Sequence, residues 1–294
     1  MLLKYIAVVQ PPYPLFRLGA PTVGKGELPG GGEHMIGFIG GGNMAEALIK
    51  GMTTSGMKDI FVSEPRKDRR AYLEKTFGVK TTDSNNEVVS LSDIIILAVK
   101  PQVMAEVLAG ISRAVTEDKT IVSIAAGISL SFMEERLKTN KLIRIMPNTP
   151  ALVLEGMSVM SMCECFSDRD ISRVREIFMS VGRVIVMPEK YMNAVTALSG
   201  SGPGFIALYA EAMIEAGVGL GLARDNAADL AVQTLLGTAR LLDTGMAPDK
   251  LREMVTSPGG TTAAGLKVFG DRGFVEIVAE AMSAAHKRAE ELGK

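Results

Sequence analysis

Tryptophan is absent and histidine is nearly so, which limits the chemistry that this chain of 294 residues can perform. The two histidines are His34, which precedes the first regular segment, and His286, which lies in the last one. This scarcity excludes Ser-His-Asp and Cys-His catalysis and most histidine-ligated metal sites, and no metal is expected. Any reaction must run without an obvious imidazole acid or base, which favours redox chemistry carried by a bound cofactor.

The chain also has few cysteines and almost no net charge. Cys163 and Cys165 are too few for a disulfide framework and lack the second pair that a zinc site needs. Lys and Arg number 32 against 33 Asp and Glu, so the formal charge is −1. No basic run stands out that could neutralise a series of phosphates. Nucleic acid is therefore not an expected partner.

Residues 1–34 differ from the rest because five prolines and the glycines at 30–32 interrupt any periodic pattern. The apolar start is too short to span a bilayer, and it is a poor secretory signal. We consider residues 1–34 a disordered extension or a mis-assigned start, with translation beginning at Met35; a targeting segment is a third interpretation. We expect a cytoplasmic protein with no membrane partner.

From Met35 onward, short runs rich in Ile and Val alternate with segments of helical periodicity. Continuous apolar runs such as 94–99 predict parallel strands buried beneath two helix layers. The predicted strands are 35–39, 59–63, 79–82, 93–99, 120–124, 142–145, 157–161 and 183–187. After Pro188 the pattern predicts helices near 190–198, 203–221, 225–243, 248–256, 261–269 and 273–292. The fold class is therefore α/β, a Rossmann-type doubly wound sheet over 35–187, followed by an all-α C-terminal domain over 188–294.

A glycine-rich turn of the form Gly-x-Gly-x-x-Ala follows the first predicted strand and opens a helix. Gly40 permits the tight turn, Gly42 lets the backbone approach a pyrophosphate, and Ala45 lets the helix pack closely on the strand. Free N–H groups at the start of the helix, at Asn43 and Met44, attract phosphates. The turn predicts a dinucleotide cofactor.

The end of the second predicted strand bears on the choice of dinucleotide, and its residues conflict. Glu64 is placed to accept the ribose hydroxyls of the adenosine, which favours NAD. Ser63, Arg66 and Lys67 are placed to hold a 2′-phosphate, which favours NADP. Arg66 and Lys67 also fit a plain solvated loop. The cofactor is therefore predicted as NADPH or NADH.

Three further loops follow predicted strands at the same edge of the sheet. They contain Val99, Lys100 and Pro101, then Ala125, then Asn148. Ligands of open α/β sheets bind outside the carboxyl ends of strands, so we expect these loops to face the second half of the cofactor and its substrate. The side chain of Asn148 suits a carboxamide or a ring nitrogen, although a turn between two prolines also explains it.

Two loops in the helical half place glycines and hydroxyls directly before a helix. Residues 199–204 read Ser-Gly-Ser-Gly-Pro-Gly, and residues 257–262 read Ser-Pro-Gly-Gly-Thr-Thr. Each forms a helix cap together with a nest of N–H groups able to hold a carboxylate. Ordinary capping explains either loop alone, but two such loops beside a dinucleotide domain favour a substrate site.

With these motifs the sequence resembles the pyrroline-5-carboxylate reductase family, the last enzyme of proline synthesis. The resemblance runs from Met35 to the C-terminus and rests on residues 36–45, 99–101, 146–150, 199–203 and, most specifically, 255–262. It implies NAD(P)H as cofactor, a homodimer with interleaved helical domains and higher assemblies of dimers such as a decamer. Residues 1–34 have no counterpart in the family, and Glu64 leaves the coenzyme preference open.

The resemblance also implies roles for the helical loops. The substrate is a cyclic imine that carries a carboxylate, which we assign to the backbone N–H groups of Gly259, Gly260 and Thr261. Ser201 is a further candidate for substrate binding, and the hydroxyl of Thr262 is assigned to the imine nitrogen as the catalytic group. The protonated imine is already electrophilic, so hydride transfer needs orientation more than a strong acid.

Other functions remain as alternatives. A 3-hydroxyacid dehydrogenase of similar build uses a lysine in the first long helix of its second domain, and this chain has no lysine between Lys190 and Lys250. A reductase of a related cyclic imine would share most of the motifs. A non-catalytic dinucleotide-binding protein would keep Gly40 and Gly42 without needing residues 257–262.

Overall fold

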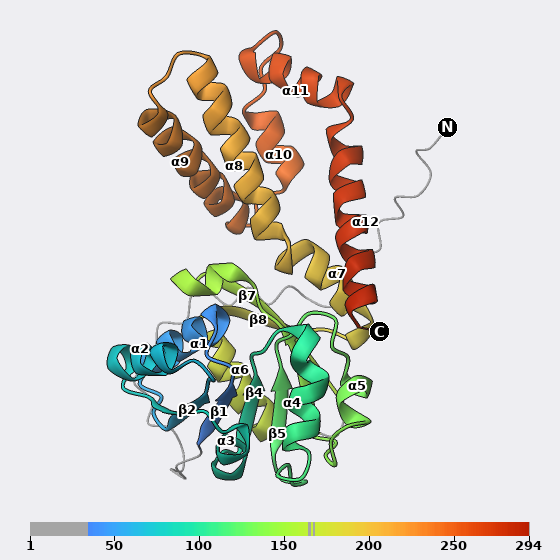
Figure 1. The fold of residues 1–294 in the computed structure, drawn as a ribbon. Coiled ribbons are helices and arrows are strands. Elements are labelled where there is room, and N and C mark those ends of the chain that lie inside the picture. The colour runs from blue at the N-terminus through green and yellow to red at the C-terminus, as the bar shows by residue number, and fades with distance from the viewer. Residues whose placement is uncertain (1–34, 164–165, 167, 294) are drawn as a thin grey trace. The chain divides into compact units, whose positions relative to one another are not determined.

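Eight strands form one sheet in the computed structural model, which describes residues 35–163, 166 and 168–293 (Figure 1). The strand order is β3-β2-β1-β4-β5-β6-β7-β8. The strands are β1 (Ile36–Ile39), β2 (Ile60–Ser63), β3 (Lys80–Thr82), β4 (Ile94–Leu97), β5 (Thr120–Ser123), β6 (Leu142–Met146), β7 (Gly156–Met162) and β8 (Gly182–Val186). Each overlaps a predicted strand, and the doubly wound α/β class is confirmed. The expectations for residues 1–34 lie outside the described residues.

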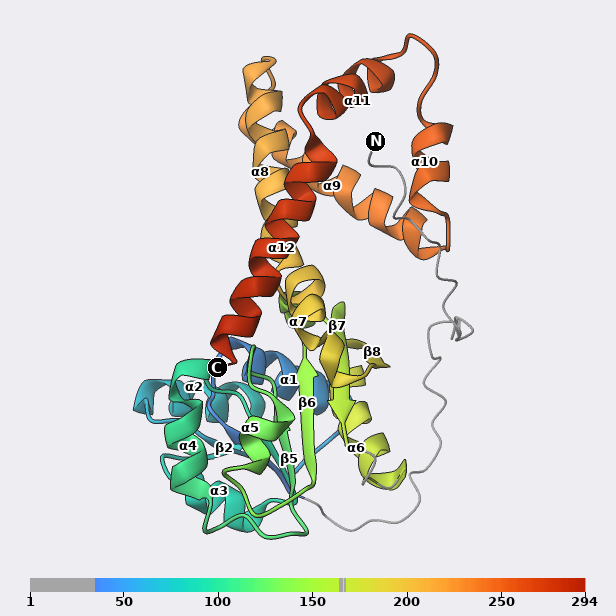
Figure 2. The same cartoon turned by 90° about the vertical axis from the view of Figure 1, so that its right-hand side faces the viewer.

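Alternate residues of the central strands pack against different helix layers (Figures 1 and 2). In β4, Ile94 and Ile96 belong to one core and Ile95 and Leu97 to another. The first core includes residues of α1 (Asn43–Thr54), α2 (Lys67–Phe77) and α6 (Asp168–Met179), and the second includes residues of α3 (Asn85–Leu91), α4 (Met104–Ile111) and α5 (Leu130–Glu134). Burial on both faces explains why the strands read as continuous apolar runs.

The strands β7 and β8 do not have the expected parallel direction. β7 pairs antiparallel with β6, with Ile143 opposite Met162 and Met146 opposite Val159, while every other neighbouring pair is parallel, so β7 and β8 both run opposite to the rest of the sheet. The connection between β6 and β7 contains only the 3-10 turn η2 (Thr149–Val153). Parallel neighbours need a crossover of about a dozen residues or more, usually with a helix, and this connection is too short for one.

Helices replace strands after β8. They are the 3-10 turn η3 (Glu189–Tyr191), α7 (Met192–Val195), the π-helical turn η4 (Thr196–Gly200), α8 (Gly202–Gly219), α9 (Arg224–Asp243), α10 (Pro248–Met254), α11 (Thr261–Asp271) and α12 (Phe274–Leu292). The pattern predicted helices over these segments, and this part of the expected fold is confirmed. Helix α8 packs on α9, while α12 packs on α7 and η4.

Many apolar side chains of these helices are exposed. Leu220 is 86% exposed, Val275 74% and Leu208 65%. In α8, an 18-residue helix, the only buried residue is Gly202. Exposed apolar side chains in such number favour an interaction face on these helices.

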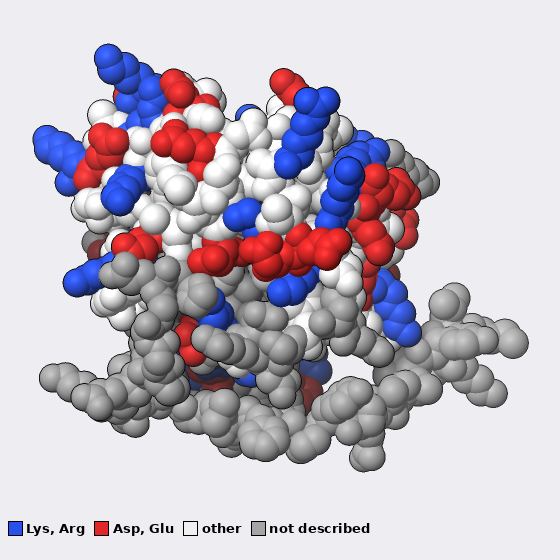
Figure 3. Space-filling view, turned by 90° about the horizontal axis from the view of Figure 1, so that it is seen from below, with Lys and Arg blue, Asp and Glu red and all other residues white. Residues whose placement is uncertain are grey.

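None of the described helices is long and apolar enough to cross a membrane. Figure 3 shows one face of the molecule, on which lysine and arginine side chains lie among aspartates and glutamates. The visible part of this face has no broad area of positive charge alone.

Candidate active site

The turn after β1 needs glycine at position 40 for reasons internal to the chain. Gly40 has φ +98°, a backbone conformation that residues with a side chain rarely adopt. A Cβ at this position would lie 2.6 Å from the carbonyl oxygen of Ala98. The N–H of Gly40 donates to the carbonyl of Ser63 at 2.8 Å. Gly40 therefore fixes the passage of the chain between the ends of β2 and β4.

Gly42 has a different environment. It precedes α1 as its N-cap, with φ −71°, and a Cβ built there would meet no atom of the described residues within 4 Å. Its carbonyl accepts from Glu46, while no side chain caps the N–H groups at the start of the helix. The chain's own packing does not require glycine here, so open space lies next to N–H groups that favour an anion.

The carboxylate of Glu64 lies beneath this turn, and 7% of the side chain is exposed. Its Oε2 accepts from the N–H of Gly41 at 3.0 Å, and its Oε1 accepts from the backbone N–H of Arg66 at 3.2 Å and from Arg66 Nε at 2.9 Å. Burial raises the pKa of Glu64, but these hydrogen bonds and the charge of Arg66 outweigh it and lower the pKa below its ordinary value. Both oxygens of an ionised carboxylate are thus engaged by the chain itself.

The other candidates at the end of β2 are divided between the interior and the surface. Ser63 is buried, and its hydroxyl donates to Oδ1 of Asn85 at 2.6 Å. Arg66 has 61% of its side chain exposed, and Lys67, the first residue of α2, is exposed as well. Of the three residues predicted for a 2′-phosphate, only Arg66 and Lys67 have exposed side chains.

The strand-end loops meet at one edge because β1, β4, β5 and β6 run in the same direction in register. Val99 and Lys100 lead from β4 into the 3-10 turn η1 (Pro101–Val103), with Lys100 exposed. Ala125 follows β5, is 6% exposed and donates its N–H to the hydroxyl of Ser123 at 3.3 Å. This edge also carries the turn at Gly40, so the structure brings these predicted cofactor residues to a common side of the sheet.

Asn148 joins this edge to the helical region. Its Oδ1 accepts from the N–H of Met157 at 2.8 Å, and its Nδ2 donates to the hydroxyl of Ser199 at 3.3 Å. Ser199 lies in η4, a π-helical turn, and such turns are frequent at functional sites. A Cβ at the neighbouring Gly200 would lie 2.5 Å from Cε of Met146. The structure thus brings residues 146–150 and 199–203, two motifs far apart in the sequence, into contact.

Ser201 stands at the start of α8. It is half-buried, its N–H donates to the carbonyl of Thr196 at 2.8 Å, and its own carbonyl accepts from Gly204 at 2.9 Å. Both bonds are made by the backbone of Ser201. Its hydroxyl takes part in neither of them.

The loop 257–262 connects α10 to α11. Gly259 has φ +72°, Gly260 donates its N–H to the carbonyl of Ser257 at 3.0 Å and forms the N-cap of α11, and Thr261 and Thr262 open that helix. Thr261 is exposed and Thr262 half-buried. Within one protomer, no hydrogen bond among the described residues joins this loop to the strand-end loops. Among the residues that the structure describes, the candidate catalytic Thr262 and the cofactor edge are therefore not joined by a hydrogen bond within one chain.

Arg69, which the sequence analysis did not single out, also touches the glycine turn. Its Nε donates to the carbonyl of Gly41 at 2.6 Å and its Nη2 to that of Gly42 at 3.4 Å. Nη2 also pairs with Glu46 of α1 at 2.5 Å, which fixes the guanidinium between α1 and α2. A run of charges at 66–70 gives no pattern that distinguishes this arginine from its neighbours.

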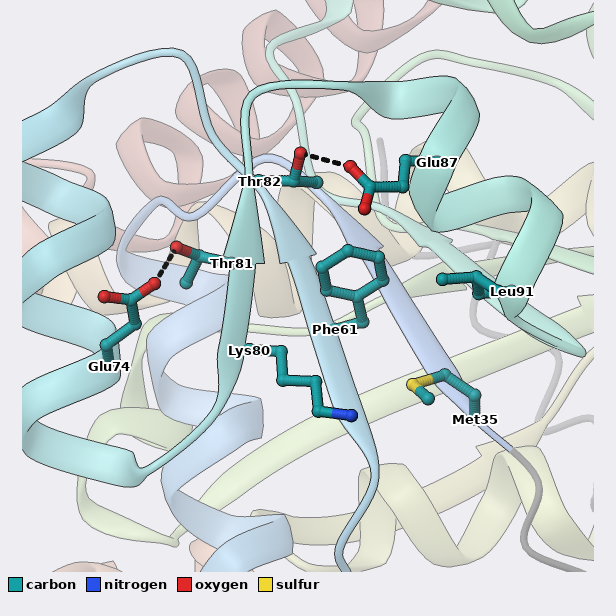
Figure 4. A pocket seen from close by; sticks show the side chains of 8 residues that line it. All are labelled: Met35, Phe61, Glu74, Lys80, Thr81, Thr82, Glu87 and Leu91. Atoms are coloured by element: carbon teal, nitrogen blue, oxygen red, sulfur yellow. Dashed lines mark hydrogen bonds between the residues drawn. The ribbon is translucent and has the colours of Figure 1, made fainter.

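A hollow of about 400 Å³ lies elsewhere, beside β2, β3 and α3 (Figure 4). Two hydroxyls that line it already donate to carboxylates, Thr81 to Glu74 at 2.5 Å and Thr82 to Glu87 at 2.6 Å. It does not include the strand-end loops after β4, β5 or β6. We therefore do not include it in the candidate site.

Known proteins match both halves of the chain. Residues 189–292 match a family described as pyrroline-5-carboxylate reductase dimerisation, and residues 35–127 match one described as NADP oxidoreductase, coenzyme F420-dependent. A pyrroline-5-carboxylate reductase of Synechocystis is 42% identical, with 88% of this chain and 98% of that protein covered. The chain belongs to the pyrroline-5-carboxylate reductase family. An Escherichia coli K12 member of the family is 39% identical over 89% of this chain and 99% of its own.

Solved structures of the same family share the fold. The pyrroline carboxylate reductase of Plasmodium falciparum, with NADP bound, superposes with a TM-score of 0.81 at 33% identity and covers 89% of this chain and 98% of its own. The Coxiella burnetii reductase gives 0.82 at 35% identity, over 90% of this chain and all of that one. A Rossmann-type domain followed by a helical domain is therefore the architecture of the family.

Proposed function

We propose that this protein reduces pyrroline-5-carboxylate to L-proline with NADPH or NADH, the last step of proline biosynthesis. It is an NAD(P)H-dependent oxidoreductase that acts on a C=N bond. The observation that carries the proposal is the match of 88% of this chain to 98% of the Synechocystis reductase, together with the dimerisation match over residues 189–292. The decisive test is turnover of the purified protein with pyrroline-5-carboxylate, followed at the nicotinamide absorbance. No oxidation of either coenzyme would contradict the proposal.

The residues at the glycine turn fit a dinucleotide. A side chain at Gly42 would fill space that the chain leaves open, and the uncapped N–H groups of α1 adjoin that space. We assign the pyrophosphate to Gly40, Gly42, Asn43 and Met44. The remaining cofactor assignments follow the strand-end loops: Val99, Lys100, Pro101, Ala125 and Asn148. When bound, the coenzyme supplies a hydride to the carbon of the C=N bond.

The loop 257–262 supports the binding of the substrate carboxylate. The N–H groups of Gly259 and Thr261 adjoin the start of α11, where backbone donors and the helix dipole stabilise an anion. The N–H of Gly260, also assigned to the carboxylate, donates to the carbonyl of Ser257 at 3.0 Å and would have to be shared with it. Thr262 would place its hydroxyl at the imine nitrogen, and Ser201 would contribute from the start of α8. These groups orient a substrate that is already electrophilic when protonated, so the chain does not need a histidine acid.

A homodimer with interleaved helical domains is part of the proposal. The exposed apolar residues of α8, α9 and α12 would be covered by a partner subunit, and within the described part of one protomer loop 257–262 has no hydrogen bond to the cofactor edge. Both observations support a site that a partner subunit completes. A decamer built from such dimers is the larger assembly that we propose, and mass measurement in solution tests it.

The domain boundary and the location complete the proposal. The end of β8 at Val186 and the start of the dimerisation match at 189 support a boundary at 187/188. We also propose a cytoplasmic location, which fractionation of cells tests directly.

A further inference from the structure

Arg144 is a buried cation that lies outside every motif of the sequence analysis. It stands in β6 between Ile143 and Ile145, which belong to the first core, so its side chain points to the other face of the sheet. Only 6% of the side chain is exposed. Burial lowers the pKa of Arg144 more than the charge of Glu189 raises it, yet a guanidinium remains protonated in proteins. A buried charge of this kind needs partners.

The partners of Arg144 come from the start of the helical domain. Its Nη1 donates to Oε1 of Glu189, which opens η3, at 3.2 Å, and its Nη2 donates to Oδ1 of Asn193 in α7 at 3.4 Å. The same Oε1 of Glu189 accepts the N–H of Leu130, the first residue of α5, at 2.7 Å. Glu189 therefore joins the first turn of the helical domain to two elements of the sheet domain, β6 and α5.

A second link between the same two segments follows. Asn148, four residues after Arg144, donates to the hydroxyl of Ser199 at 3.3 Å. Residues 189–199 are thus held near both ends by β6 and the loop after it. Ser201 comes directly after this segment and opens α8, so its position relative to the strand-end loops depends on these bonds.

An exposed ion pair gives a contrast. Arg183 of β8 forms two hydrogen bonds of 2.7 Å with the carboxylate of Asp243 at the end of α9, so it also joins a strand to a helix. The two side chains are 72% and 54% exposed, however, and exposed pairs of this kind hold little. Both residues lie outside the segment 189–201. Arg183 is therefore a suitable control for Arg144.

We propose that Arg144, acting through Glu189 and Asn193, is a positioning residue that sets the place of Ser201 and the start of α8 relative to the strand-end loops. The inference rests on the proposed function for the reaction that is measured. It adds a residue that serves this reaction without touching the substrate or the coenzyme.

The kinetic test combines Arg144→Met with Glu189→Gln. Glutamine keeps an acceptor for the N–H of Leu130, and the double variant has no unpaired charge at this place, so it should fold. Because small displacements in an active site are costly, kcat with pyrroline-5-carboxylate should fall by about tenfold to a hundredfold. The dissociation constant of NADPH, measured by fluorescence titration, should change by less than about twofold, since the strand-end loops stay in place.

Two single variants complete this comparison. Arg144→Lys should recover part of the lost kcat, because lysine keeps the charge but cannot reach both acceptors with the fork of a guanidinium. Arg183→Met should change neither kcat nor the binding of NADPH. Circular dichroism shows that each variant is folded at the temperature of the assay. Full kcat in the folded double variant would show that the pair only stabilises the fold, and the inference would then be wrong.

Hydrogen exchange gives a second measurement, which does not depend on turnover. Backbone amides in residues 189–204 should exchange faster in the double variant and at the unaltered rate in Arg183→Met. Unchanged exchange in the double variant would overturn the inference. Faster exchange there, in a protein that never reduces pyrroline-5-carboxylate, would support the positioning role and contradict the proposed function instead.

Discussion

The side-chain amide of Asn148 donates to the hydroxyl of Ser199 at 3.3 Å, across 51 positions of the sequence. This bond links the loop after β6 to the π-helical turn that precedes α8. It connects the edge proposed for the cofactor with the segment that carries Ser201. A displacement of either residue would therefore shift the segment that carries the other.

Substituting Asn148 or Ser199 by alanine should lower the free energy of unfolding by different amounts. Ser199→Ala loses one hydrogen bond, at a cost of about 0.5–1.5 kcal/mol in the free energy of unfolding. Asn148→Ala should cost more, because the N–H of Met157 also loses its acceptor. Unfolding of both single variants and the double variant in denaturant measures the coupling. Strictly additive effects would show that the 3.3 Å contact contributes nothing.

Gly42→Val should abolish coenzyme binding while leaving the fold intact. A Cβ at this position meets no atom of the described residues within 4 Å, so the side chain is expected to block a ligand without disturbing packing. Circular dichroism and thermal unfolding report the fold, and fluorescence titration with NADPH reports binding. Unchanged NADPH affinity in a folded variant would refute the assignment of the phosphates to this turn.

Thr262→Ala should lower kcat more than it raises KM, because we assign its hydroxyl to the nitrogen that changes from imine to amine. The loss of one such bond in the transition state predicts a decrease of about tenfold to a hundredfold. Thr262→Ser should retain most activity. Thr261→Ala is the neighbouring control and should matter less, since only its backbone is assigned a role. A larger kcat effect at Thr261 than at Thr262 would show that the nitrogen partner is misassigned.

In solution the protein should be at least a dimer at micromolar concentration. Light scattering coupled to size exclusion measures the mass directly. Leu208→Asp and Leu220→Asp place charges on apolar surface that is 65% and 86% exposed in one protomer, so either is expected to weaken assembly without harming the isolated fold. Lys250→Asp, in the solvent-exposed pair with Glu253, is a control for added negative charge. A stable monomer of the unaltered chain would contradict the dimer.

Acid should remove the stabilising contribution of Glu64. Its pKa in the folded protein is lowered from 4.5, so the folded state favours the ionised form. The contribution is fully present above the unfolded value of about 4.5 and is lost as pH falls through the lower folded value. The difference in melting temperature between the unaltered chain and Glu64→Gln should be constant near neutral pH and shrink below about pH 4.5. A difference independent of pH down to pH 3 would contradict this.

The sequence predicted the central strands well because they are continuous apolar runs buried on both faces, as at Ile94–Leu97. It did not predict the direction of β7, or of β8 beside it, since burial is the same for either direction and only the length of the connection from β6 to β7 distinguishes them. The glycine turn was recognisable because its pattern is local.

The contacts within the candidate site were harder to predict. The bond between Asn148 and Ser199 joins segments with no local relationship. The hydrogen bond from Arg69 to Gly41 depends on the rotation of α2 about its axis. This helix is rich in charged residues and buries only Leu73, so the sequence does not specify that rotation. The engagement of Glu64 by Gly41 and Arg66 could not be inferred either, because its position alone suggested a ribose contact.

The contrast between Gly40 and Gly42 has a practical consequence for mutational scanning. A library selected for protein abundance would discard most substitutions at Gly40, where a side chain meets a backbone carbonyl, and would retain most of those at Gly42. A library selected for growth without proline would discard both. Positions that are tolerant in the first selection and intolerant in the second would mark the surface that the coenzyme and the substrate cover, without any need for a bound complex.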